Sequence, residues 1–131
     1  MKDIDVYVLR NASRKGIGFF EASGFYPDFI LWLVKGKVQR VVFIDPKGIV
    51  HLRGMDDEKV QLFKKLQQDI RPQIKDPNIL LDSYILSDTD YQHVSYWSKS
   101  YGKYDFKKNH ILFMGDDYNY IENLLKSILG K

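Results

Sequence analysis

The sequence contains no cysteine among its 131 residues. Disulfide frameworks, thiolate nucleophiles and cysteine-ligated zinc sites are therefore excluded, and a reducing, intracellular compartment is favoured. Long hydrophobic runs are also missing, since the longest strongly apolar run covers only residues 29–34. A membrane-spanning helix needs about 20 such residues, and the acidic opening at residues 1–6 is unlike a signal peptide. We therefore expect a cytoplasmic protein with no membrane partner.

Glycine and proline are scarce, with 9 and 4 residues respectively, while 44% of the chain is hydrophobic and 28% is charged. This composition excludes disordered, collagen-like and low-complexity classes. The length predicts a single domain over residues 1–131. The net charge of +3 permits nucleic-acid binding without demanding it. Aromatic residues make up 15% of the chain, more than a core of this size needs, so some rings are expected on a surface.

Hydrophobic periodicity predicts the order strands, helix, strand, strand, helix. The helix over 56–70 has acids in its first turn and ends at Pro72, and a second helix after Gly115, capped by Asp116 or Asp117, places an apolar stripe on one side. Residues 17–21 are expected to form a further strand or to continue the first, and residues 87–109 show no clean period. The fold class predicted is α/β (α+β), a mixed central sheet flanked by helices. The strands expected are residues 5–10, 29–34, 38–44, 79–86 and 110–114, and the stripe consists of Ile121, Leu124, Leu125 and Ile128.

The clearest local signal is a hairpin around Lys35-Gly36-Lys37. If Gly36-Lys37 is a two-residue loop with glycine first, counting down the two strands makes Asp28 and Asp45 direct cross-strand neighbours. Opposed β-carbons in such a pair lie about 4.5–5.5 Å apart, close enough for two carboxylates to share one divalent cation. A three-residue loop would shift this register by one, and a bulge at either proline would disturb it.

Three ionisable residues, Asp28, Asp45 and Lys47, stand at the ends of otherwise apolar strands. A carboxylate beside a buried run is costly unless it is solvated or has a partner such as a metal, and both explanations stay open at this point. Asp45 and Lys47 share one face if the strand continues through Pro46. Two acids and a lysine on one face suit metal-assisted hydrolysis of a phosphodiester, with the acids holding Mg²⁺ and the lysine stabilising developing negative charge.

This arrangement resembles the PD-(D/E)xK nuclease superfamily, whose motif pairs a Pro-Asp at a strand end with a later acid, any residue and lysine. The matching segments are Pro27-Asp28 and Asp45-Pro46-Lys47. The surrounding letters, FYPDFILWL and FIDPKG, are similar to the C-terminal nuclease domain of type III restriction and DEAD-box helicase subunits. The resemblance implies a restriction-endonuclease-like fold, with the Pro46 carbonyl as a third metal ligand beside Asp28 and Asp45, and Lys47 as the catalytic cation.

An Asp-x-Lys tripeptide alone has little specificity, because the chain contains three of them. Those starting at Asp57 and Asp105 lie at a helix start and in a polar stretch, without an opposing acid on a hairpin. The competing interpretation of Asp45 and Lys47 is a strand-end pair with solvated charges. Members of the superfamily usually open with a helix, whereas this chain opens with a strand, so we expect a fragment or excised domain of a larger helicase-nuclease.

Several other residues have two interpretations. Glu21 is either a supplementary metal ligand or a solvated turn carboxylate, and His51, four residues after the motif strand, is set outside the site. His93 and His110 have no metal-ligand spacing and are interpreted as surface or strand-edge residues. Aromatic and lysine side chains alternate over 91–108, which suits base stacking, a contact with the missing helicase, or a loop packed on its own sheet. On the first helix, Lys59, Gln61 and Lys64 are expected on a solvated face, with phosphate contact as the alternative.

Together these features predict a Mg²⁺-dependent DNA endonuclease domain, with Mn²⁺ as a substitute ion. Its expected partners are DNA, the rest of a parent helicase chain and a recognition or modification subunit. The rival interpretation is a catalytically silent nuclease-like domain that binds DNA or another subunit.

Overall fold

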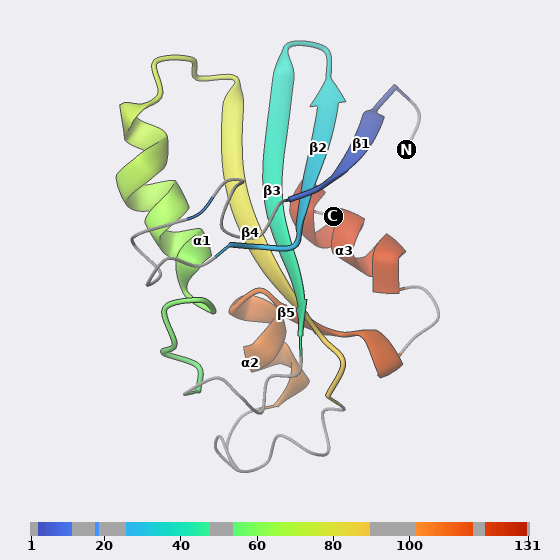
Figure 1. Cartoon of the computed structure of the whole chain (residues 1–131). Coiled ribbons are helices and arrows are strands. Elements are labelled where there is room, and N and C mark those ends of the chain that lie inside the picture. Colours follow the sequence, from blue (N-terminus) through green and yellow to red (C-terminus); the bar gives the residue numbers. More distant parts are fainter. Residues whose placement is uncertain are drawn as a thin grey trace.

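The computed structural model describes residues 3–11, 18, 26–47, 54–89, 102–116 and 120–130. Within them, one five-stranded sheet has helices packed on both faces (Figure 1). The chain is thus α+β, as predicted at this level. The strands are β1 (Asp5–Arg10), β2 (Phe29–Lys35), β3 (Val38–Lys47), β4 (Ile79–Ser87) and β5 (Ile111–Phe113), and the α-helices are α1 (Leu62–Lys65), α2 (Lys103–Lys108) and α3 (Tyr120–Leu129).

The sheet is mixed, and its spatial order follows the chain from β1 to β5. β1, β2 and β3 form an antiparallel meander, whereas β4 runs parallel to β3 and β5 runs parallel to β4. Each of the five strands overlaps a segment predicted from the sequence. Consequently the carboxyl ends of β3, β4 and β5 meet at one end of the sheet, which is the lower end in Figure 1.

The hairpin between β2 and β3 has the predicted register. Lys35 pairs with Val38, which leaves a two-residue loop, and Gly36 has a φ of 60°. A left-handed conformation at the first loop position suits glycine and matches the twist of the flanking strands. The ladder runs down to Phe29 opposite Ile44, one step before Asp28 and Asp45. The two acids therefore lie at the end of this hairpin.

The helix predicted over 56–70 begins later than expected. Residues 58–61 are turns, α1 starts at Leu62, and the helix continues through a π-helical segment, Leu66–Ile70. The delay has a local cause, because the Asp57 carboxylate accepts a hydrogen bond from the Lys59 N–H at 2.9 Å and stabilises a turn there. At the other end, Pro72 lies in a 3₁₀ turn, Arg71–Gln73, as expected for a helix terminator.

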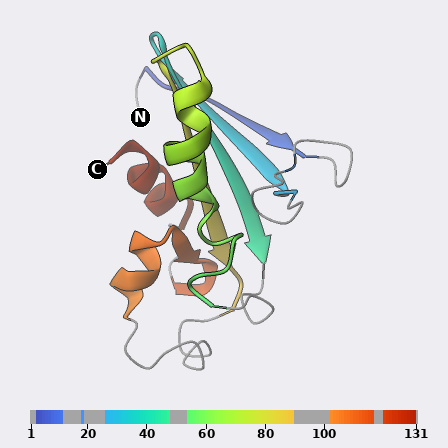
Figure 2. The same cartoon turned by 90° about the vertical axis from the view of Figure 1, so that its left-hand side faces the viewer.

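Alternate residues of the central strands face two different layers of helix, which lie on opposite sides of the sheet in Figure 2. Ile30 and Phe43 pack under the helix that starts with α1, together with Leu62 and Leu66. The other face packs against α3. Its buried residues are Leu31, Leu33, Val42, Ile44, Tyr84, Leu86, Leu124 and Ile128. The two helix layers therefore bury the middle of the sheet from both sides.

The predicted stripe of α3 is only partly buried. Leu124 and Ile128 are 2% and 5% exposed, and Leu125 is half-buried against the same core. Ile121, in contrast, is 50% exposed, so its expected burial was wrong. Ile121 lies in the first turn of α3. The residues of the stripe that are buried against the sheet lie one and two turns later.

The remaining expectations divide between described and undescribed residues. Residues 103–108, which showed no clean period, form α2, with Phe106 buried. The strand expected over 17–21, the cap at Asp117 and residues 91–101 lie outside the described residues. Where the chain is described, none of its helices has the length and apolar character needed to span a membrane.

Candidate metal and phosphodiester site

Hydrogen bonds hold the Pro27-Asp28 corner to Asn11, which follows β1, and to Asp45 of β3. The Asn11 side-chain amide donates to the Pro27 carbonyl at 2.9 Å, and the Asn11 N–H donates to the Asp28 carbonyl at 2.8 Å. On the other side, the Asp28 N–H donates to Asp45 Oδ1 at 3.0 Å. Pro27 is fully buried while the Asp28 side chain is exposed. The corner is therefore fixed, and its carboxylate faces solvent.

Asp45 is the buried acid of the pair. It is 4% exposed and sits on β3 opposite Ile85 of β4. Its hydrogen bond from the Asp28 N–H joins the two acidic positions that the hairpin register brought together. A buried carboxylate needs such donors or a cation, because burial disfavours its charge. Asp45 therefore stabilises the corner, and its position next to Asp28 also suits ion binding.

Pro46 is accommodated because β2 has already ended beside it. Lys35 and Val38 flank the two-residue loop as a hydrogen-bonded pair. Because hydrogen-bonded residues alternate along an antiparallel strand, the backbone N–H and C=O groups of even-numbered β3 residues point toward β2. The nitrogen of Pro46 points the same way, but the ladder with β2 stops at Ile44, so no ladder hydrogen bond is lost. The Pro46 carbonyl faces the same unladdered side, beside Asp28. This direction of the carbonyl is compatible with the third ligand that the resemblance implied.

The predicted lysine occupies the last position of the same strand. β3 continues through Pro46 to Lys47, which pairs with Ser87 of β4. This extended course is the condition under which positions 45 and 47 share a face. The Lys47 side chain lies outside the described part of the structure, as do Glu21 and His51. The structure thus brings Asp28, Asp45 and Pro46 together and leaves the lysine's contacts undescribed.

The donors gathered here are all oxygens, two carboxylates and one backbone carbonyl. Hard oxygen donors of this kind suit Mg²⁺, which keeps several waters and takes only one or two carboxylates from the protein. Among the described residues there is no cluster of three or more histidines and acids that could hold an ion. Asp28, Asp45 and the Pro46 carbonyl are oxygen ligands of the kind that Mg²⁺ takes, and the three together would leave the rest of its octahedral shell to water.

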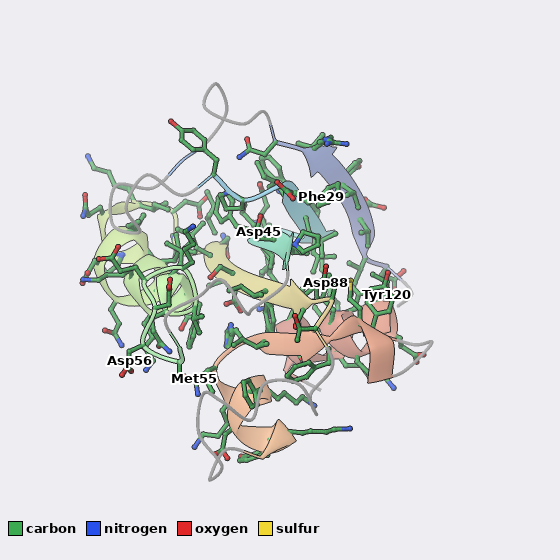
Figure 3. All side chains as sticks on the ribbon, turned by 60° about the horizontal axis from the view of Figure 1, so that its bottom comes forward. Phe29, Asp45, Met55, Asp56, Asp88 and Tyr120 are labelled. Carbon is green, nitrogen blue, oxygen red and sulfur yellow. The ribbon has the colours of Figure 1, made fainter. Side chains whose placement is uncertain are left out.

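A further acid, Asp88, was not recognised in the sequence. It follows β4 directly, at an exposed position, in a turn where the Ser87 hydroxyl donates to the Thr89 carbonyl at 2.8 Å and accepts from the Thr89 N–H at 3.1 Å. Figure 3 labels Asp45 and Asp88 at the ends of the neighbouring strands β3 and β4. The available signal was an acid immediately after an apolar run, but the parallel pairing that brings the two strand ends together is not local in sequence.

His110 forms a second polar cluster with Asp82 and Ser83 of β4. Its Nδ1 lies 2.8 Å from Asp82 Oδ1 and 3.0 Å from the Ser83 carbonyl. The imidazole is stacked between Phe63 and Tyr84, at ring-centroid distances of 3.7 and 4.3 Å. Burial, and then the Asp82 carboxylate, raise the pKa of Tyr84. His110 lies in the turn directly before β5, so the strand predicted over 110–114 begins one residue later, and the partners of the imidazole give it a structural role.

The other two Asp-x-Lys tripeptides serve local structure, as the sequence indicated. Asp57 stabilises the turn before α1, and the Asp105 carboxylate accepts a hydrogen bond from the Gly102 N–H at 2.8 Å at the start of α2. The solvated position predicted for Gln61 was wrong. Its side-chain amide donates to the Met55 carbonyl at 2.6 Å and to Asn109 Oδ1 at 3.0 Å. It therefore joins the turn before α1 to the end of α2.

The described end of the Tyr/Lys-rich segment is a solvated helix surface. Tyr104 is 71% exposed, and the Lys108 ammonium lies 5.7 Å from its ring centroid. Lys103 and Lys107 line a hollow of about 250 Å³ with Tyr120 and Asn123. The residues that line this hollow come from α2, β5 and α3; α2 lies at the lower end of the sheet in Figure 1. For Tyr104, packing onto its own sheet is excluded by this exposure.

Comparison with known proteins gives no relative from which to transfer a function. No family model matches the chain, and neither a curated protein nor a solved structure matches it.

Proposed function

We propose that the chain is a Mg²⁺-dependent nuclease domain of the PD-(D/E)xK type, with a restriction-endonuclease-like fold, that hydrolyses phosphodiester bonds in DNA. The observation that carries this proposal is the hydrogen bond from the Asp28 N–H to Asp45 Oδ1, which joins the two halves of the motif across the hairpin. Asp28, Asp45 and the Pro46 carbonyl would hold the ion. Lys47 is proposed as the catalytic cation.

The proposed roles follow from the environment of each residue. Asp45 is buried and held, so it offers a preorganised oxygen donor, whereas the exposed carboxylate of Asp28 offers a donor open to substrate and water. When bound, the ion supplies a Lewis acid and a water of lowered pKa. Lys47 would stabilise the negative charge that develops on the phosphoryl oxygens. The two acids cannot do this, because they are negatively charged themselves.

The surface around the carboxyl end of the sheet supports a nucleic-acid substrate. Lys103, Lys107 and Lys108 of α2 are exposed there, and Tyr104 offers an exposed ring for a base. Lysines supply the sequence-independent part of DNA affinity by neutralising phosphates, and an exposed aromatic ring adds stacking. The same surface would serve a silent DNA-binding domain, so the chemistry at Asp45 and Lys47 has to be tested directly.

The test is nicking of supercoiled plasmid by the purified chain in Mg²⁺, compared with Asp45→Asn and Lys47→Ala. Asp45→Asn keeps an oxygen acceptor for the Asp28 N–H and should fold, while losing the charge that holds the ion. Lys47→Ala should lower the single-turnover rate roughly a hundredfold or more. Lys59→Ala is the matched control, because this lysine belongs to the tripeptide whose aspartate stabilises the turn before α1.

A second measurement separates ion binding from cleavage. Mg²⁺ should raise the melting temperature of the wild-type chain and of Lys47→Ala, by an amount that grows with concentration above the Kd, and should leave Asp45→Asn unchanged. A Mg²⁺-dependent rise without nicking would favour the catalytically silent domain. An unchanged wild-type melting temperature together with no nicking would contradict the proposed function.

A further inference from the structure

The outer strand β1 is apolar and open to solvent. All six of its residues are exposed, including Val6 at 44%, Tyr7 at 55%, Val8 at 63% and Leu9 at 50%. β1 is the first strand of the sheet and forms its ladder with β2, so its other edge carries no strand among the described residues (Figures 1 and 2). An exposed apolar edge of this kind readily pairs with a strand from another chain.

The hydrogen bonding of β1 identifies which backbone groups face outward. The Asn11 N–H donates to the Asp28 carbonyl at 2.8 Å, and this pair continues the register of β1 with β2. Because hydrogen-bonded residues alternate along an antiparallel strand, odd-numbered residues of β1 bond to β2. The backbone groups of Val6, Val8 and Arg10 therefore point away from β2. These are the groups that a new strand would have to meet.

We propose that a second copy of this chain pairs with β1 through its own β1, in antiparallel orientation, so that the two sheets become continuous. A two-fold axis perpendicular to the sheet keeps each side chain on its own face, so even-numbered residues oppose even-numbered ones. Outward-facing groups then meet outward-facing groups. The two-fold symmetry and the hydrogen bonding thus both require even-numbered residues to oppose even-numbered residues, and the alternation of β1 satisfies this requirement.

One register uses every outward-facing residue of the strand. It pairs Val8 with Val8 of the second copy at the axis, and Val6 with the second copy's Arg10 on either side. Tyr7 then lies opposite Leu9 of the second copy on the other face, twice by symmetry, which is a favourable aromatic–aliphatic pair. Moving the axis to Tyr7 would place Arg10 opposite Ile4, which precedes β1, and Asp5 opposite Leu9.

The charges of β1 favour this antiparallel pairing with itself. The strand starts with an acid, Asp5, two residues after Asp3, and ends with a base, Arg10. In this register Asp5 of each copy lies opposite Asn11 of the other, one residue along the strand from its Arg10, whereas parallel pairing would align like charges. The acids at this edge also disfavour a nucleic acid as its occupant. A second copy of the chain is therefore the occupant that complements this edge in the order of its charges and in its hydrogen bonding.

The absence of cysteine allows a direct test of the register. Tyr7→Cys and Leu9→Cys chains are mixed in equal amounts and mildly oxidised. Opposed β-carbons at such a pair are close enough for a disulfide, so the mixture should give a covalent dimer that neither variant gives alone. The matched control mixes Val6→Cys with Leu9→Cys, which lie on opposite faces of the paired strands and should not cross-link.

Sedimentation velocity tests the association without a cross-link. The wild-type chain should show a rising dimer fraction with concentration, and Val8→Lys should remain monomeric because it places two like charges together at the axis. Ile121→Lys, an equally drastic change at an exposed position on α3, should leave the dimer unchanged. Both lysine variants should keep the wild-type melting temperature at low concentration, so a loss of dimer in Val8→Lys is not a loss of fold.

Two results would overturn the inference. One is a wild-type chain that stays monomeric at all concentrations, with no cross-link in the mixture beyond that of the single variants. The other is efficient cross-linking of Tyr7→Cys alone, which would put the axis at Tyr7 and contradict this register. Neither result bears on the nuclease proposal, because β1 contains none of the proposed site residues.

Discussion

β1 and β3 have similar compositions, yet they lie in different environments in the folded protein. Both are rich in β-branched and aromatic residues, but Val42 in β3 is fully buried while Val8 in β1 is 63% exposed. β3 lies between β2 and β4 with helices on both faces, whereas β1 is an edge strand whose six residues are all exposed. The comparison teaches that strand composition indicates where a strand forms, while the layers around it decide what it contributes to stability.

The sharpest test of this comparison is a matched pair of truncations. Val42→Ala should destabilise the fold by about 2–3 kcal/mol, because it removes buried methyl groups and leaves a cavity under α3. Val8→Ala should change stability by less than about 0.5 kcal/mol. Urea unfolding at a low protein concentration, where β1 is unpaired, measures both. Equal losses in the two variants would contradict the contrast between the strands.

A smaller effect distinguishes the buried acid from the exposed one. Asp45→Ala removes the acceptor of the Asp28 N–H at a buried position and should cost about 1–3 kcal/mol without any metal present. Asp28→Ala removes an exposed carboxylate and should be close to neutral in the same buffer. Thermal and urea unfolding in EDTA measure the two costs. A neutral Asp45→Ala would show that the hydrogen bond does not stabilise the corner.

The smallest expected effect compares a buried and an exposed tyrosine at high pH. Because burial raises the pKa of Tyr84, the folded state holds this proton more tightly than the unfolded state, whose value is near 10.0. The resulting stabilisation is fully present below pH 10 and is lost as the pH rises above it. Tyr84→Phe should therefore flatten the decline in stability above pH 10, whereas Tyr7→Phe, at an exposed position, should not. A wild-type decline unchanged in Tyr84→Phe would assign it to other groups.

The candidate site was predictable as far as its signals are local. The glycine-first loop at Gly36 fixed the pairing of β2 with β3, and this pairing carried Asp28 and Asp45 to neighbouring positions. What the hairpin could not predict is that Asp45 is buried and accepts from the Asp28 N–H, while the Asp28 carboxylate is exposed. Those differences depend on the burial of the end of β3 in the tertiary structure and on the hydrogen bonds that hold the Pro27-Asp28 corner.

The errors in the predicted helices have the same origin. Periodicity located both segments, but the turn stabilised by Asp57 delayed α1 to Leu62, and Ile121 remained exposed in α3. An apolar period records which residues suit a buried face, not whether a sheet lies opposite each of them. Local hydrogen bonds at a helix start compete with the helix itself, and side-chain composition alone does not decide between them.

By itself the sequence determined the strands, the hairpin register and the absence of cysteine chemistry, because these depend on residue types and on neighbours close along the chain. Only the tertiary structure decided the parallel pairing of β4 with β3, which brings Asp88 to the same end of the sheet as Asp45, and the stacking of His110 between Phe63 and Tyr84. It also decided that β1 is an exposed edge. These outcomes depend on contacts between residues far apart in sequence, whose partners are chosen by the packing of whole layers.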